Sequence, residues 1–313
     1  MKAFSFFNKS ITAIDPGSYE TKIIEGKQER DGIAVKKAFS FMTPPDTYDN
    51  GYIKDEFRLT AAAREELRKN NISGGTCHIT VKSTAILTRE ILLPSLSSKD
   101  IEGLLSYQLE EYLPMDFSKY VIQHKGIEKV EADGKEKLNV LVVAIPRELV
   151  DLHYNFVREL GMNPEVMDYQ SNGIWKFLNY ADSINGSLYP REKILAAIDM
   201  GYSSSNVTII SKGNAKISRV IDSGGLSVKT SIEGIMDKID KVFKYYASKE
   251  PEERIEVLLL YGGLSRIKGI EKLFSGYFNI PASVLDNTGK IHLAGDINAY
   301  ANCIGALIRD DGV

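Results

Sequence analysis

Two segments of the chain share one pattern of apolar and polar positions. Residues 11–24 form an apolar run, a polar turn that contains Asp15-Pro-Gly-Ser, and a second apolar run. Residues 194–210 repeat this order around Asp199-Met-Gly-Tyr-Ser. Each segment is typical of two strands that are joined by a tight turn. Because the two copies stand about one domain length apart, the repeat predicts a duplicated architecture.

The elements that follow the two hairpins come in a similar order in both halves of the chain. In the first half the pattern predicts a third strand, a helix, a strand and, after an insertion, another strand and helix, at 32–41, 55–70, 76–81, 164–169 and 170–180. In the second half it predicts a strand, a helix, a strand, a helix, a short strand and a final helix, at 215–221, 231–248, 255–261, 267–277, 282–285 and 298–308. The fold class is therefore α/β, with one plan used twice.

An inserted block interrupts the first half. Its pattern predicts three strands and a helix, at 88–94, 120–127, 139–145 and 101–113. A further helix at 146–161 begins near a proline and is followed by a glycine, an arrangement that helix ends favour. His153 lies on the apolar face of this helix, so we expect it in the core and not at a catalytic site. The block predicts a small α+β subdomain.

Composition limits the class of protein. The chain has 313 residues, of which 43% are hydrophobic and 26% charged, as in a soluble globular protein large enough for two domains. Its net charge of −3 argues against nucleic acid as a partner. Its two cysteines form neither a disulfide framework nor a zinc site, and they fit a reducing cytosol. No apolar run approaches the ~20 residues that span a bilayer, and the start is not a secretory signal.

The two hairpin turns are the strongest candidates for chemistry. A glycine lets the backbone approach a ligand closely, and amides at such a turn can surround an anion. Asp15 and Asp199, each at a strand end, could hold the water shell of Mg²⁺, which joins carboxylates to phosphates. One such turn alone is more often structural. Two copies in matching contexts favour a polyphosphate gripped from both sides.

Two later segments extend this interpretation. In residues 258–270 a strand enters Gly262-Gly263, where the turn opens a helix, and backbone without side chains can lie against a base or a sugar. The helix predicted at 298–308 is small and apolar, with Gly305 inside it. Such a helix packs closely and could act as a hinge back to the first half.

The order of two phosphate hairpins, a Gly-Gly turn and a terminal connecting helix resembles the actin-like ATPases (actin, the Hsp70 chaperones and sugar kinases). Within that superfamily the chain is similar to the PilM family of type IV pilus assembly, which is related to FtsA. Three stretches of the inserted block carry this likeness, namely Leu92-Leu-Pro, Gln108-Leu-Glu-Glu-Tyr-Leu-Pro and Val142-Val-Ala-Ile-Pro. The resemblance implies a duplicated actin-like (ribonuclease H-like) fold, with two domains around a nucleotide cleft and an inserted small α+β subdomain.

The resemblance also implies domain bounds. The first actin-like domain would comprise 1–87 and 163–189, the latter including the connection, and the FtsA/PilM-type subdomain would be 88–162. The second actin-like domain would be 190–297, and 298–313 would be a connecting helix that packs back on the first domain.

The same resemblance implies a set of site residues for ATP or ADP with Mg²⁺. Asp15, Gly17, Ser18, Tyr19 and Lys22 would contact the phosphates and the metal's water on one side, and Asp199, Gly201, Tyr202, Ser203 and Ser204 on the other. The sugar and base would meet Gly224, Gly225, Lys241, Gly262, Gly263 and Ser265. Lys238, Val242 and Leu264 depart from residues common in the family, so the adenosine contacts are expected to be weaker or altered.

Hydrolysis would need a carboxylate or an amide that positions water in line with the γ-phosphate. Asp168 and Gln170, where the strand at 164–169 ends, are the candidates that the pattern offers. Because PilM-like proteins are regarded as nucleotide binders with poor turnover, the resemblance implies weak ATPase activity at most.

The resemblance implies a scaffold at the inner face of the cytoplasmic membrane, with a role in twitching motility. Its partner would be the N-terminal cytoplasmic peptide of a PilN-like inner-membrane protein, and the scaffold would link that protein to a motor ATPase or platform protein. Self-association stays open. Two alternatives also stay open, namely an FtsA-like filament protein and a small-molecule kinase with Asp168 as its base. FtsA ends in an amphipathic anchor helix, and residues 308–313 do not resemble one.

Overall fold

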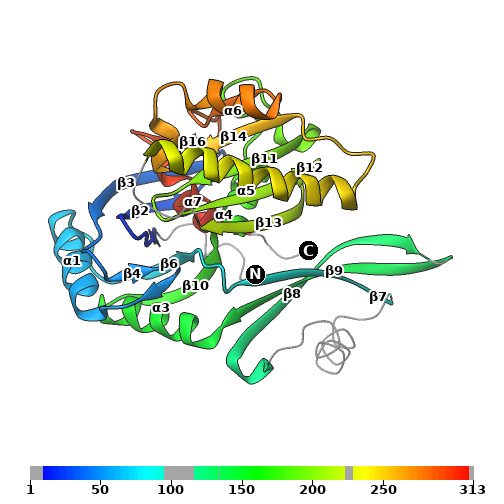
Figure 1. Cartoon of the computed structure of the whole chain (residues 1–313). Helices are drawn as coiled ribbons and strands as arrows, with labels where there is room; N and C mark the ends of the chain where they lie inside the picture. The colour runs from blue at the N-terminus through cyan, green and yellow to red at the C-terminus, as the bar shows by residue number, and fades with distance from the viewer. Residues whose placement is uncertain (1–9, 95–115, 133, 223–227, 310–313) are drawn as a thin grey trace. The chain divides into compact units, whose positions relative to one another are not determined.

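A computed structural model describes residues 10–94, 116–132, 134–222 and 228–309 (Figure 1). Its contacts divide the chain into two compact units, of which one comprises residues 1–84 and 153–313 and the other residues 85–152. The larger unit contains both hairpins of the repeat. The domain bounds expected from the sequence stay a prediction, because this division does not separate the two halves of the larger unit.

The first sheet of the larger unit has six strands in the order β10-β6-β1-β2-β3-β16. Its central strand β1 runs antiparallel to β2 and parallel to β6. Strand β6 in turn runs parallel to β10, and β2 antiparallel to β3. The bounds are Ile11–Asp15 (β1), Glu20–Gln28 (β2), Ile33–Met42 (β3), Thr76–Val81 (β6), Asn163–Tyr169 (β10) and Ile291–His292 (β16).

The second sheet has the order β13-β12-β11-β14-β15, with the hairpin strands β11 and β12 antiparallel and β11 parallel to β14. Its strands are Ile194–Met200 (β11), Ser204–Ser211 (β12), Asn214–Asp222 (β13), Val257–Tyr261 (β14) and Ala282–Val284 (β15). If the strands of each half are numbered along the chain, both sheets contain the order third, second, first, fourth, fifth. The duplicated α/β architecture that the repeat predicts is thus confirmed.

The helices match the predicted ones to within a few residues. They are Glu56–Lys69 (α1), Arg147–Glu159 (α3), Gln170–Tyr180 (α4), Val228–Lys249 (α5), Ile270–Phe278 (α6) and Ile297–Leu307 (α7). Short 3-10 turns occur at Phe117–Lys119 (η2), Pro190–Glu192 (η3) and Gly263–Arg266 (η4). In the described part of the chain, none of the helices is both long and apolar enough to cross a membrane.

The sequence pattern did not reveal two small elements. The hairpin of Tyr48–Asp49 (β4) and Tyr52–Ile53 (β5) interrupts the expected passage from β3 to α1. Strand β16 leaves the second half of the chain and pairs with β3 at the edge of the first sheet. Both elements involve strands of only two residues, which are too short to show a periodic pattern.

The smaller unit contains a three-stranded antiparallel sheet in the order β7-β9-β8. Its strands are Leu87–Pro94 (β7), Tyr120–Ala132 (β8) and Lys135–Pro146 (β9). Alternate apolar residues of β7 and β9 are buried, as in a sheet with one covered face: Ile91, Leu93, Val140, Val142 and Ala144. The helix predicted at 101–113 lies outside the described residues.

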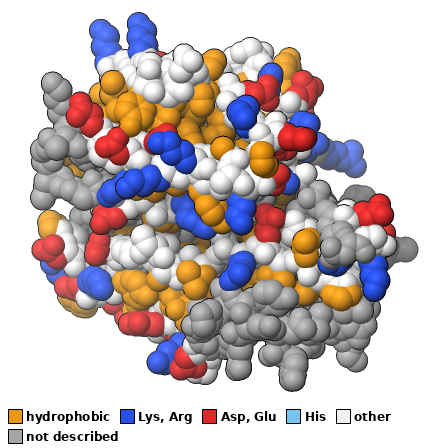
Figure 2. All heavy atoms as spheres, turned by 45° about the vertical axis from the view of Figure 1, so that its right-hand side comes forward, with side chains coloured by type: hydrophobic (Ala, Val, Ile, Leu, Met, Phe, Trp, Pro, Cys, Tyr) orange, Lys and Arg blue, Asp and Glu red, His pale blue; other side chains and the backbone are white. Residues whose placement is uncertain are grey.

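The core of the larger unit has two parts. One cluster packs α5 and α6 against the second sheet, and Figure 1 shows α5 lying across those strands. The other cluster joins both sheets to α4 and α7, and it includes Phe177 and Ile304. Cys77 and Cys303 are both buried and free, and His153 is fully buried as expected. Basic and acidic side chains are interspersed over the described part of the face in Figure 2, in keeping with the small net charge.

Helices α4 and α7 approach each other at a pair of glycines. A Cβ atom on Gly305 would lie 2.1 Å from the carbonyl oxygen of Gly173. The C-terminal end of α7 is then fixed by two buried side chains. His78 donates through Nδ1 to the Ala306 carbonyl at 2.6 Å, and Lys176 Nζ donates to the Ile308 carbonyl at 2.9 Å. Burial lowers the pKa of His78 to about 4, so the ring stays neutral at pH 7.

The glycine contact predicts an unusual response to alanine. Gly305→Ala should lower the free energy of unfolding by about 2 kcal/mol or more, because the methyl group would overlap the Gly173 backbone. Gly276→Ala, inside α6 with no atom within 4 Å of its Cβ position, is the matched control and should stabilise by up to about 1 kcal/mol. Urea unfolding of both variants measures the difference. Equal stability of the two would contradict the close helix contact.

Candidate functional site

The two hairpin turns meet at the carboxyl ends of the central strands. Asp15 ends β1, and Asp199 lies one residue before the end of β11. Together the turns line a cavity of about 80 Å³. Twelve of its lining residues were candidates from the sequence: Asp15, Gly17, Ser18, Tyr19, Lys22, Gln170, Asp199, Gly201, Tyr202, Ser203, Ser204 and Gly263. The others are Pro16, Glu20, Tyr48, Asn50, Gly51 and Lys82.

Glycine has the same steric role in both turns. A Cβ atom on Gly17 would lie 2.6 Å from the carbonyl oxygen of Glu20, and one on Gly201 would lie 2.5 Å from that of Ser204. Both contacts join a residue to the third residue after it, so the two turns fold alike. Gly262 is also required, because its φ is +87° and a Cβ atom there would lie 2.2 Å from Oδ1 of Asp199.

The carboxylate of Asp15 is buried and receives hydrogen bonds from neutral groups. Thr80 Oγ1 and Gln170 Nε2 donate to Oδ1 at 2.5 and 2.6 Å, and Asn302 Nδ2 donates to Oδ2 at 3.4 Å. These donors come from β6, α4 and α7. The amide oxygens of Gln170 and Asn302 are buried without a hydrogen-bond partner in the described structure. Oxygen acceptors of this kind suit water around a bound ion.

The carboxylate of Asp199 is held differently, by a cation. Lys82 Nζ lies 3.1 Å from its Oδ2 atom and donates also to the Ser204 carbonyl at 3.1 Å. Lys22 is a second cation beside both carboxylates. Burial by itself lowers the pKa of Lys22, but Asp15 and Asp199 outweigh it, and the pKa lies above its usual value. The described cavity lining therefore contains three carboxylates, those of Asp15, Asp199 and Glu20, and two ammonium groups, those of Lys22 and Lys82. The ammonium groups can receive phosphates.

The two turns also touch each other. The hydroxyl oxygens of Ser18 and Ser203 lie 2.7 Å apart, and the rings of Tyr19 and Tyr202 stack with centroids 4.8 Å apart. The cavity of about 80 Å³ is smaller than the roughly 300 Å³ at which ligand pockets begin. The turns would therefore have to separate before a nucleotide could lie between them.

The candidate residues for the sugar and base are placed unequally. Gly263 lines the cavity, whereas Ser265 is buried and holds the turn by donating to the Gly262 carbonyl at 2.7 Å. Lys241 is exposed on α5 and is not among the residues that line the cavity. Gly224 and Gly225 lie outside the described residues. The adenosine contacts stay a prediction.

The structure separates the two candidates for positioning water. Gln170 lines the cavity. Asp168 does not, and its carboxylate is engaged by Lys176 Nζ at 2.7 Å and by Asn172 Nδ2 at 2.8 Å. The geometry therefore favours Gln170, and the role of Asp168 stays a prediction.

Three residues that donate hydrogen bonds to the two carboxylates, Thr80, Lys82 and Asn302, were not among the candidates from the sequence. Lys82 directly follows the buried strand β6, and a charged residue at the carboxyl end of a parallel strand is a signal that could have identified it. Asn302 is a polar residue within an apolar helix, which points to a specific partner. Thr80 gives no such signal, because threonine is common in strands.

The residues at this cavity fit a magnesium ion that is held mainly through water. The carboxylates of Asp15 and Asp199 and the unpartnered amide oxygen of Gln170 supply the hard oxygen atoms that such an ion prefers. Among the described residues, no group of three or more His, Cys, Asp or Glu side chains could hold a metal directly. Asp15 and Asp199 are the residues that would hold the water shell.

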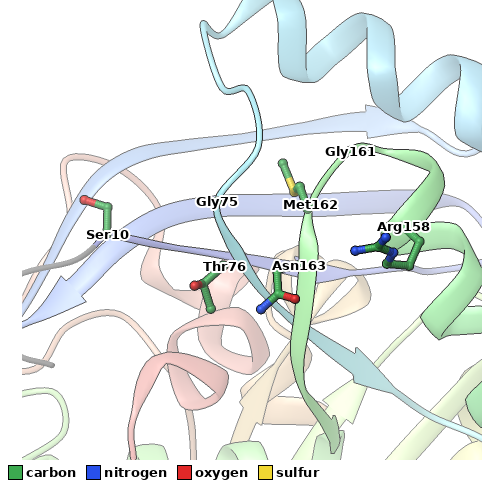
Figure 3. A pocket seen from close by; sticks show the side chains of 7 residues that line it. All are labelled: Ser10, Gly75, Thr76, Arg158, Gly161, Met162 and Asn163. Carbon is green, nitrogen blue, oxygen red and sulfur yellow. The ribbon is translucent and has the colours of Figure 1, made fainter.

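A second hollow, of about 650 Å³, lies at the opposite ends of the strands (Figure 3). Ser10, Thr76 and Asn163 stand at the amino ends of β1, β6 and β10. Arg158 is the one charged side chain in its described lining, which also includes Gly75, Gly161 and Met162. Because ligands of α/β sheets bind outside the carboxyl ends of strands, the cavity between the hairpins is the better nucleotide site.

The duplicated sheets and their facing Asp-x-Gly turns define an actin-like ATPase fold. A structure titled as a PilM-PilN type IV pilus biogenesis complex has a TM-score of 0.80 with this chain, at 16% identity over 96% of this chain and 99% of that one. The ethanolamine utilization protein EutJ from Carboxydothermus hydrogenoformans has a TM-score of 0.57, at 11% identity over 96% and 89%. An actin-like protein of unknown function from Bacteroides thetaiotaomicron has a TM-score of 0.51, at 13% identity over 97% and 98%.

The family follows from the sequence match. The family described as type IV pilus assembly protein PilM matches residues 13–237, which is more than half of the chain. The chain belongs to this family. No curated protein matches it.

The hydrogen bonds around Asp15 predict a pH-dependent variant. Asn302→Asp would place a second buried carboxylate against Asp15, which should lower the free energy of unfolding by about 2–4 kcal/mol at pH 8. Much of this loss should be regained near pH 5, because the paired carboxyls then share a proton. Asn302→Ala, which only removes a long hydrogen bond, should cost about 1 kcal/mol at both pH values. Denaturant unfolding at pH 8 and pH 5 compares them, and a pH-independent loss in Asn302→Asp would refute the contact.

Proposed function

We propose that this protein is a nucleotide-binding scaffold of the type IV pilus assembly machinery. ATP or ADP binds with Mg²⁺ between the two hairpin turns. The observation that carries this proposal is the convergence of Asp15, Asp199, Lys22 and Lys82 on one cavity at the carboxyl ends of the central strands. Family membership favours this function over the FtsA-like and kinase alternatives.

The side chains have distinct roles in the proposed complex. Asp15 and Asp199 hold the water shell of Mg²⁺, and Lys22 lies beside both carboxylates to receive phosphate charge. The backbone amides around Gly17 and Gly201 can approach the phosphates, because neither residue carries a side chain. Gln170, with its unpartnered amide oxygen, orients a water for slow hydrolysis. We expect weak activity, because Asp15 and Asp199 hold the metal's water and Glu20, the other carboxylate of the described cavity lining, accepts a hydrogen bond from Ser40 at 2.6 Å.

In this proposal, nucleotide binding controls a contact with another protein. The solved relative is titled as a complex of PilM with PilN, which supports a PilN-like partner for this chain. The partner offers its N-terminal cytoplasmic peptide, and the scaffold lies in the cytoplasm at the inner face of the membrane and links that partner to the pilus motor. Closure of the turns around the nucleotide sets the form that binds the peptide.

Calorimetry with Mg²⁺ and ATP tests the nucleotide site. Asp15→Ala and Asp199→Ala should each weaken binding by about 100-fold or more, because each removes a carboxylate that orders the metal's water. Asp240→Ala, which removes a half-buried Asp on α5 that pairs with Lys244, is the control and should bind as the wild type does. Absence of binding to the wild type, or wild-type affinity in both site variants, would refute the nucleotide site.

Fluorescence anisotropy with a labelled peptide tests the partner. The peptide is the N-terminal cytoplasmic segment of the PilN-like protein from the same genome, and a scrambled peptide is the control. We expect binding that strengthens by about tenfold or more with Mg²⁺ and ATP, because the nucleotide favours the binding-competent form. Equal weak binding of both peptides in every nucleotide state would contradict a PilN-like partner.

A further inference from the structure

Lys82 connects the two repeats across the cavity. It follows the last residue of β6 in the first sheet, and its ammonium group reaches Asp199 and the Ser204 carbonyl in the second hairpin, each at 3.1 Å. The side chains are largely buried, with 16% of Lys82 and 7% of Asp199 exposed. An ion pair so shielded from solvent is stronger than an exposed one.

The second turn makes room for this ammonium group. A Cβ atom on Gly201 would lie 2.8 Å from Lys82 Nζ. The cation therefore occupies the concave side of the turn, beside the glycine that lets the backbone approach a ligand. Lys22 lies beside both carboxylates, whereas Lys82 pairs with Asp199 and the hydrogen bonds to Asp15 come from neutral groups. The two carboxylates are therefore not equivalent toward a metal ion.

A metal ion and Lys82 place positive charge at the same carboxylate. Binding of Mg²⁺ beside Asp199 would put a divalent cation next to the ammonium group of Lys82. The two positive charges would repel each other. Lysine has a flexible stem with three rotatable donors, and it binds phosphate as a point charge. Rotation of the stem would move the ammonium group from Asp199 to a phosphate that lies against the second turn.

We propose that Lys82 is a tethered cation that pairs with Asp199 in place of the metal and transfers to the nucleotide phosphates when the metal binds. The proposal rests on the nucleotide-binding function above, and it adds a positioning residue to that site. Lys82 lowers the affinity for a free divalent metal and raises the affinity for the metal–nucleotide complex. These two effects have opposite signs, which a purely structural residue would not produce.

The test is Lys82→Met, which keeps the length of the side chain and removes its charge. Mn²⁺ alone is titrated first and followed by the electron paramagnetic resonance signal of the free ion, and Mg²⁺ with ATP is titrated by calorimetry. Lys82→Met should bind Mn²⁺ at least about tenfold more tightly and Mg²⁺ with ATP at least about tenfold more weakly than the wild type. Lys82→Arg keeps the charge and should stay within about threefold of the wild type for Mn²⁺.

Lys244→Met is the matched control, because Lys244 also pairs with an Asp but is exposed on α5. It should change neither affinity. The proposal is overturned if Lys82→Met and the wild type bind Mn²⁺ equally well, or if neither binds it. It is also overturned if a folded Lys82→Met loses affinity for both Mn²⁺ and Mg²⁺ with ATP. A mixed result separates the two proposals. If Lys82→Met binds Mn²⁺ more tightly but the wild type does not bind ATP, the pairing of Lys82 with Asp199 is supported. The nucleotide function and the transfer of Lys82 to phosphate are then refuted.

Discussion

Hydrogen bonds to the buried carboxylate of Asp15 connect several elements of the larger unit. They come from Thr80 on β6, Gln170 on α4 and Asn302 on α7, elements that stand far apart in the chain. A buried charge requires such donors, because an unpaired carboxylate in the interior is very costly. The same group that faces the cavity therefore also fixes the two connecting helices at the first hairpin.

Helices α4 and α7, which both donate to Asp15, also contact each other directly. Gly173 and Gly305 let the two helix backbones approach closely, and His78 and Lys176 bind the carbonyl groups at the end of α7. Strand β16 adds a further connection from the second half to the first sheet. A change in the spacing of the hairpin turns is thus mechanically connected to the helices that join the halves, as a closing cleft requires.

Duplication produced two turns with the same backbone but different electrostatics. Gly17 and Gly201 exclude a side chain for the same steric reason, yet Asp15 is held by neutral donors and Asp199 by Lys82. Because Lys22 lies beside both carboxylates, the pairing of Lys82 with Asp199 is what makes them different. The two copies have therefore diverged in charge while they kept their geometry.

The sequence by itself determined the duplicated α/β plan, the two hairpins and the cavity residues at their turns, because alternating apolar runs and Asp-x-Gly turns are local signals. It did not reveal β16 or the hairpin β4–β5, which are too short to be periodic. Only the tertiary structure decided the partners of the two carboxylates. Asn302 lies 287 positions from Asp15 in the chain, and Lys82 lies 117 positions from Asp199. The tertiary structure also decided which of the two candidates for positioning water lies at the cavity. Gln170 lines the cavity, whereas Asp168, two residues earlier, pairs with Lys176.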